Sequence, residues 1–190
     1  RSPLRYLTDD LYRRTIGALA GGRARTDRTW VAEHSAVRLR YRPSMRGYGK
    51  QAVALATWSG LPLLPHIHHP VLVVTGDDDP LTPVANSMMI AHLVPDARLL
   101  VIPDEGHLML LDDRSTAHAP IRQFFEAETL AEAPVWQRAR RVNEDDVRSA
   151  LAGKGLQIQP WPWGPLGSYL RYRCVTRTLT PPSGTSTARS

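Results

Sequence analysis

Two loops of this 190-residue chain carry side chains suited to acid–base chemistry. Asp79 comes three residues after an apolar run closed by Gly76, and His107 comes four residues after a second run closed by Pro103. A carboxylate can hold the Nδ1–H of an imidazole, fix its tautomer and stabilise the imidazolium that forms when the ring accepts a proton. A serine hydroxyl activated by that histidine would complete a nucleophilic set. We therefore predict that Asp79 and His107 form an acid–base pair.

The segments around these two residues predict the order strand, helix, strand, helix. Residues 71–75 and 98–102 are apolar runs of the kind found in strands buried on both faces of a parallel sheet. Between them, Thr82 is predicted to cap a helix that has Pro83 at its first position. Ligands of open α/β sheets bind beyond the carboxyl ends of the strands. Adjacent strands would bring both loops to that edge.

The regions on either side of residues 67–128 lack the alternation of strands and helices that this segment predicts. Residues 1–66 predict a helical, cap-like region with breaks at Gly21 and Gly22, at Pro43 and from Gly47 to Gly49.

The region after residue 128 predicts an appendage and a tail. Within residues 129–180, Asn143 predicts the start of a short capped helix, and a segment rich in Trp and Pro follows it. The aromatic side chains of that segment would either pack on the protein body or dock on a polymer or membrane surface. Residues 181–190 predict a disordered tail.

The net charge of +6 is unevenly distributed along the chain. Residues 1–50 and 131–190 are basic, and residues 51–130 are acidic. Of the 24 basic residues 22 are Arg, there is no basic run of five or more, and no zinc-finger or RNA-binding signature occurs. We therefore expect a solvated, arginine-rich surface and no nucleic-acid partner.

Composition also bears on location and cofactors. The sequence has no stretch of 18 or more apolar residues, so it predicts no transmembrane helix. No secretory signal is recognisable, and Cys174, as the lone cysteine, cannot form an internal disulfide. These features favour the cytoplasm. His66 and His68, or the acidic run 77–79, could in principle hold a metal, but the spacing lacks the further ligands such sites need. We expect neither a metal nor a cofactor.

Two motifs carry a family resemblance. The run Gly-Asp-Asp-Asp-Pro-Leu-Thr-Pro at residues 76–83 and the run Asp-Glu-Gly-His-Leu at residues 104–108 resemble the acid and histidine motifs of the α/β-hydrolase superfamily. In that family the chain order is nucleophile, acid, histidine. The resemblance implies that Asp79 is the triad acid and His107 the triad base. More narrowly, residues 47–128 resemble intracellular poly(3-hydroxyalkanoate) depolymerases and related esterases, and residues 1–60 would correspond to the helical cap.

The chain departs from this family in one respect. The nucleophile motif Gly-x-Ser-x-Gly, which precedes the acid and the histidine in the family, does not occur in these 190 residues. The resemblance thus implies the C-terminal portion of an α/β-hydrolase fold, with a helical cap, the last two parallel strands and their helices, and an incomplete sheet. The missing N-terminal half of the fold could be a partner.

These features lead to an expected function with alternatives. We expect a cofactor-free carboxylic-ester hydrolase that acts on a small or polymeric ester and takes its nucleophile from outside this chain. An aspartate nucleophile would instead fit an epoxide hydrolase or dehalogenase, in which His107 activates water. A truncated or pseudo-hydrolase module without activity is the third alternative.

Overall fold

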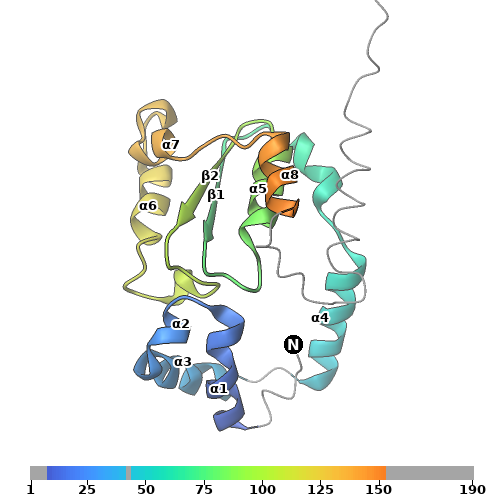
Figure 1. The fold of residues 1–190 in the computed structure, drawn as a ribbon, viewed down its shortest axis with the longest axis vertical. Helices are drawn as coiled ribbons and strands as arrows, with labels where there is room; N and C mark the ends of the chain where they lie inside the picture. Colours follow the sequence, from blue (N-terminus) through green and yellow to red (C-terminus); the bar gives the residue numbers. More distant parts are fainter. Residues whose placement is uncertain (1–7, 42–43, 153–190) are drawn as a thin grey trace, which may run out of the picture.

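A computed structural model describes residues 8–41 and 44–152 of the chain. The first part of the chain is helical, and the part that follows contains both strands and helices (Figure 1). The first helices are α1 (Asp9–Ala20), α2 (Arg23–Thr26), α3 (Arg28–Arg40) and α4 (Met45–Thr57). The α/β part comprises the 3-10 helix η2 (Leu61–His66), β1 (Val71–Gly76), α5 (Val84–Leu93), β2 (Ala97–Ile102), the 3-10 helix η3 (Met109–Leu111) and α6 (His118–Glu126). The last elements are η4 (Leu130–Glu132), α7 (Pro134–Arg138) and α8 (Glu144–Ala152).

The two strands form a parallel pair. Val71 lies opposite Ala97 and Gly76 opposite Ile102, so the strands are in step over their whole length. Helix α5 connects them, as a parallel pair requires a crossover. Because the strands end side by side, the loops that follow them leave from the same edge of the sheet. The predicted strand–helix–strand–helix order is confirmed, and the sheet within the described residues has two strands.

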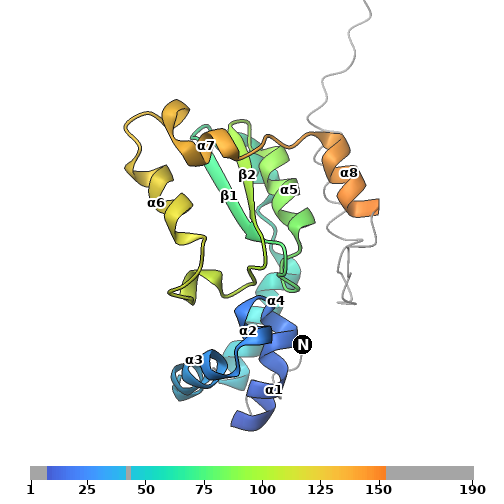
Figure 2. The same cartoon turned by 60° about the vertical axis from the view of Figure 1, so that its left-hand side comes forward.

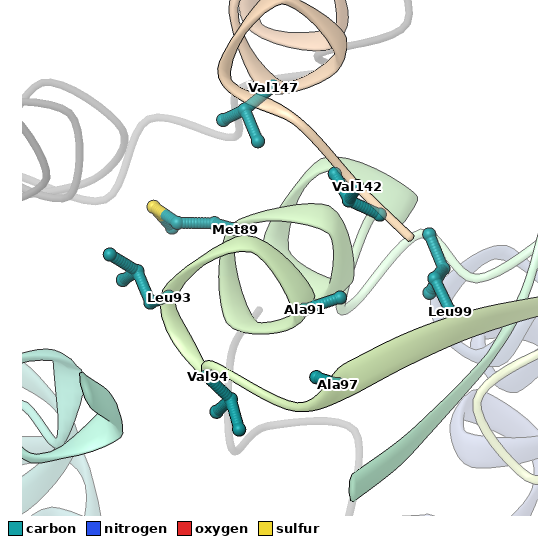
Figure 3. Close-up of a cluster of buried hydrophobic side chains, with 8 residues drawn as sticks. All are labelled: Met89, Ala91, Leu93, Val94, Ala97, Leu99, Val142 and Val147. Atoms are coloured by element: carbon teal, nitrogen blue, oxygen red, sulfur yellow. The ribbon is translucent and has the colours of Figure 1, made fainter. Parts of the chain in front are cut away.

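Helices cover both faces of this sheet. On one face α5 and α8 pack against Leu99, which is 2% exposed, in a cluster of eight buried side chains (Figure 3). On the other face Leu72 and Leu100 pack against Val135 and Trp136 of α7. Alternate residues of each strand thus point to different apolar clusters, as the period of a strand requires. The first four residues of β1 are only half-buried, whereas the sequence predicts a strand that is buried on both faces.

The first three helices build a cluster of their own. Tyr12, Ile16, Trp30 and Val31 are among its buried residues. Helix α1 is capped by Thr8, whose side chain accepts a hydrogen bond from the Leu11 backbone N–H. The predicted break at Gly21 and Gly22 is confirmed. Figures 1 and 2 show this group of helices beyond the end of the sheet where β1 and β2 finish.

The predicted break from Gly47 to Gly49 is wrong. Helix α4 runs through both glycines. A glycine inside a helix costs about 0.5–1 kcal/mol relative to alanine. The Ser44 hydroxyl offsets part of that cost because it accepts the Gly47 backbone N–H at 3.0 Å and caps the helix. Apolar side chains of α4, including Val53 and Leu55, are exposed.

The capped helix after Asn143 is confirmed as α8. The Asn143 side chain accepts the Asp146 N–H at 2.8 Å, and the Asp146 carboxylate accepts the Asn143 N–H at 3.0 Å. This reciprocal pair satisfies two backbone donors at the start of the helix. The segment rich in Trp and Pro, Cys174 and the predicted tail all lie outside the described residues.

Candidate active site

The Asp79 side chain is fixed by its own loop. Its Oδ1 accepts the backbone N–H groups of Leu81 at 2.8 Å and Thr82 at 3.0 Å. This arrangement is an Asx-type turn, which Asp forms readily after a strand. The side chain is only 7% exposed, so the carboxylate has one well-defined orientation. Its other oxygen, Oδ2, faces the second loop.

His107 meets that oxygen. The distance from His107 Nδ1 to Asp79 Oδ2 is 3.0 Å, which is a hydrogen bond or an ion pair depending on the charge of the ring. The His107 side chain is 40% exposed. With Nδ1 directed at the carboxylate, Nε2 is the ring nitrogen suited to exchange a proton with a reacting group. The structure therefore brings together the two residues that the sequence singled out.

Thr82 has a different place from the one predicted. Helix α5 begins at Val84 with Pro83 as its N-cap, and no side chain caps it. The Thr82 hydroxyl instead donates to Asp79 Oδ2 and lies 3.5 Å from His107 Nδ1. The predicted cap at Thr82 is wrong, because the helix begins two residues later and the Thr82 hydroxyl is directed at Asp79 and His107.

These contacts determine the charge of Asp79. Burial alone would raise the pKa of its carboxyl group. Hydrogen bonds from His107 and Thr82 stabilise the ionised form and outweigh burial, so the pKa of Asp79 lies below its ordinary value. At neutral pH the site thus holds a carboxylate, the form that can orient and stabilise an imidazolium.

Hydrogen bonds between the two loops hold the site together. The Asp78 N–H donates to the Glu105 carbonyl at 3.0 Å, and the Asp104 N–H donates to the Asp77 carboxylate at 2.7 Å. Gly76 permits this approach because a Cβ there would overlap the backbone of Glu105. The loops are thus joined at several points beyond the hydrogen bond between Asp79 and His107.

A turn of the helical region also contacts both loops, and the sequence did not predict it. We call residues 20–25 the docking turn. Its Ala20 carbonyl accepts the His107 N–H at 2.7 Å, and its Gly22 N–H donates to Asp78 Oδ2 at 2.7 Å. Gly21 and Gly22 are the signal for this turn in the sequence. They indicate a break between helices, but they do not indicate which segment of the chain contacts that break.

Arg23 of the docking turn forms a second anchor. Its guanidinium pairs with Asp112, whose side chain is only 7% exposed, and with Asp27 at 3.1 Å. The Arg23 Cζ also lies 5.9 Å from the centroid of the Trp30 ring, within the range of a cation–π contact. The ion pair links α2 to the segment that follows His107.

The acidic run 77–79 does not resemble a cation loop. Asp77 accepts the Asp104 N–H, Asp78 accepts the Gly22 N–H, and Asp79 pairs with His107. Each carboxylate thus has a protein donor of its own, and the three do not converge. Within residues 8–41 and 44–152, no group of three or more His, Cys, Asp or Glu side chains is placed to hold a metal ion.

A family model supplies the deciding observation. The model of the alpha/beta hydrolase fold matches residues 19–114, just over half of the chain. This range contains the docking turn, both strands and both loops of the candidate site. The chain belongs to the α/β-hydrolase fold family. Within that family, the two-stranded parallel sheet and its helices agree with the portion of the fold that the sequence motifs indicate.

Two relatives support this membership. The hydrolase-fold chain is similar to a poly(3-hydroxyalkanoate) depolymerase of Ectopseudomonas oleovorans, at 38% identity over 120 residues. That match covers 63% of this chain and 41% of the depolymerase, so the chain spans about two fifths of the length of this relative. The chain also resembles the crystal structure of BpoC of Mycobacterium tuberculosis H37Rv, which is named as a non-heme bromoperoxidase. The TM-score is 0.53 and the identity 26%, with 62% of this chain and 45% of BpoC covered.

The longest helices among the described residues of the hydrolase-fold chain, α3 and α4, have 13 residues each. In the part of the chain that the structure describes, no helix is both long and apolar enough to cross a membrane.

Proposed function

We propose that this chain contributes the acid and the base of a serine-type carboxylic-ester hydrolase. The observation that carries the proposal is the 3.0 Å contact between His107 Nδ1 and Asp79 Oδ2 at the carboxyl ends of two adjacent parallel strands. In a hydrolase fold this edge of the sheet is where ligands bind. The low pKa of Asp79 supports the same role, because the acid must stay ionised while the histidine gains and loses a proton.

The chemistry we propose is a two-step acyl transfer. His107 Nε2 removes the proton of a serine hydroxyl as the serine oxygen bonds to the ester carbonyl carbon. The ester C–O bond then breaks, and His107 returns the proton to the leaving alcohol. In the second step His107 takes a proton from water as the water oxygen attacks the acyl carbon. The bond between that carbon and the serine oxygen then breaks, His107 returns the proton to the serine, and the acid is released. Asp79 orients the ring and stabilises its charged form throughout.

The nucleophile is proposed to lie outside these 190 residues. No Gly-x-Ser-x-Gly occurs in the sequence, and two serines of the described part serve other groups: Ser115 donates to the Glu105 carboxylate, and Ser35 to the Val31 carbonyl. We propose that the remaining portion of a hydrolase fold supplies the serine and the oxyanion donors. The 190-residue chain alone is accordingly expected to be inactive.

The substrate that we propose is an ester. Similarity to a poly(3-hydroxyalkanoate) depolymerase supports an ester substrate, either the polymer or a short acyl ester. The cytoplasm is the proposed location, since the lone cysteine makes an internal disulfide impossible. No cofactor takes part in the proposed steps.

The test is ester hydrolysis by the natural polypeptide that contains this sequence. We expect it to hydrolyse p-nitrophenyl butyrate, and His107→Ala to lower kcat by roughly 10³-fold or more, because loss of a triad member removes nucleophile activation. His69→Ala is the matched control, since His69 is exposed and lies in the segment before β1. Unchanged turnover in His107→Ala would contradict the proposal.

A further inference from the structure

The docking turn lies against both loops of the site. Figures 1 and 2 show α2 next to the loops that leave the ends of β1 and β2. Ala20 bonds to the backbone of His107 itself, and Gly22 bonds to Asp78, the residue before Asp79. One short stretch of backbone therefore holds the histidine loop and the acid loop at the same time.

Close backbone packing makes this contact specific. Gly21 and Gly22 have φ values of 64° and 51°, which glycine adopts at little cost. A Cβ on Gly21 would overlap the Asp78 carbonyl, and one on Gly22 would overlap the backbone N of Gly106. Because backbone meets backbone without intervening side chains, a shift of the docking turn would be transmitted directly to both loops.

An ion pair secures the acid side of the contact. Arg25 Nη1 lies 2.7 Å from Asp78 Oδ1, and the Gly22 N–H donates to Oδ2 of the same carboxylate. Both oxygens of Asp78 are therefore held by the docking turn. The Asp78 side chain is one-third exposed and the Arg25 side chain half exposed, so the pair forms at the rim of the site and does not belong to the buried core.

We propose that Arg25 and Asp78 are positioning residues, which hold the docking turn against the two loops and thereby set the distance between Asp79 and His107. The inference rests on the proposed function for the chemistry of that pair. Neither residue transfers a proton or contacts the reacting atoms in the proposed chemistry. Loss of the ion pair lets the acid loop move relative to the histidine loop, which slows the chemical step and leaves substrate binding largely unchanged.

The experiment compares variants of the natural polypeptide that contains this chain. Arg25→Ala and Asp78→Asn are expected to lower kcat for p-nitrophenyl butyrate by about 10- to 100-fold, since a displacement of 1 Å in a catalytic group can cost that much. KM is expected to change less than about twofold. Arg25→Lys is expected to restore most of kcat, because the ammonium group of lysine can also pair with Oδ1 of Asp78.

Arg14→Ala is the matched control. Arg14 forms an exposed ion pair with Asp10 at 2.8 Å, and because both residues belong to α1 this pair does not link α1 to either loop. Exposed pairs of this kind contribute little to stability. The control is expected to keep the kcat and KM of the unmodified protein.

Hydrogen exchange at the His107 backbone N–H gives a readout that does not require activity. This amide bonds to the Ala20 carbonyl, so release of the docking turn is expected to speed its exchange at least tenfold in Arg25→Ala and Asp78→Asn but not in Arg14→Ala. Should Arg25→Ala fail to fold, Arg25→Gln takes its place beside Asp78→Asn.

Two results would overturn the positioning role. One is exchange and kcat in Arg25→Ala and Asp78→Asn equal to those of Arg14→Ala. The other is a loss of kcat that Arg25→Lys does not reverse. Full turnover in His107→Ala would instead contradict the proposed function, and the exchange rates would still decide whether Arg25 and Asp78 hold the docking turn.

Discussion

Asp79 has several hydrogen-bond donors and little exposure to water. Two backbone N–H groups and the Thr82 hydroxyl point at its carboxylate, and His107 completes the set. A carboxylate in such surroundings stays charged even though burial opposes charge. The residue is therefore specialised for a constant negative charge, which is the property that a partner of a proton-transferring histidine needs.

The lowered pKa of Asp79 predicts how stability depends on pH. Because the folded-state pKa lies below the ordinary value of 3.8, ionised Asp79 stabilises the fold above that value, and this contribution is lost as the pH falls through the folded-state pKa. Compared with Asp79→Asn, the unmodified protein is expected to be more stable at pH 7, by about 1–3 kcal/mol. The difference is expected to shrink below about pH 4.

Urea unfolding of both proteins at pH 7, 5 and 3.5 measures this dependence. A difference in the free energy of unfolding that stays constant over the three pH values would show that the charge of Asp79 contributes nothing.

At the scale of elements, the site depends on three segments that are far apart in the sequence. The loop after β1, the loop after β2 and the docking turn approach each other through glycines, and Gly106 is at the centre. A Cβ on Gly106 would overlap the Ala20 carbonyl, which accepts the His107 N–H. This position therefore requires the smallest residue for steric reasons.

Gly106→Ala is expected to destabilise the protein by roughly 1–3 kcal/mol, because the added methyl group has no space. Gly49→Ala is the matched control, since a Cβ at Gly49 meets no atom within 4 Å and alanine favours the α4 helix by about 0.5–1 kcal/mol. Chemical denaturation of both variants tests the contrast. Equal stability of the two variants would mean that the docking turn does not approach Gly106 closely.

Strands and the acid–histidine pair could be predicted from the sequence because their signals are local. Residues 71–75 and 98–102 are apolar runs with clear ends, and the two motifs follow them directly. The docking turn could not be predicted in this way, because its partners lie more than 50 residues away. The predicted break in α4 is wrong, because the two glycines are a local signal for a break whereas the helix is started by the cap that Ser44 provides.

At the scale of the whole molecule, the described residues form part of an α/β-hydrolase fold in which Asp79 and His107 lie side by side at the carboxyl ends of two parallel strands. Helices α5 and α8 cover one face, and α6 and α7 cover the other (Figure 2). The helices α1 to α3 close the end at which the loops meet. The family match, the two relatives and the geometry agree on a hydrolase fold, and we propose that Asp79 and His107 act as one catalytic unit within it.

A double-mutant cycle on kcat/KM for p-nitrophenyl butyrate measures whether the two residues act together, with Asp79→Asn and His107→Ala made singly and together in the natural polypeptide. If the two residues act as a unit, each single substitution lowers kcat/KM by roughly 10³-fold or more, and Asp79→Asn costs less than about threefold once His107 is absent. Losses that multiply in the double variant would contradict the claim, because they would show that the two residues act independently.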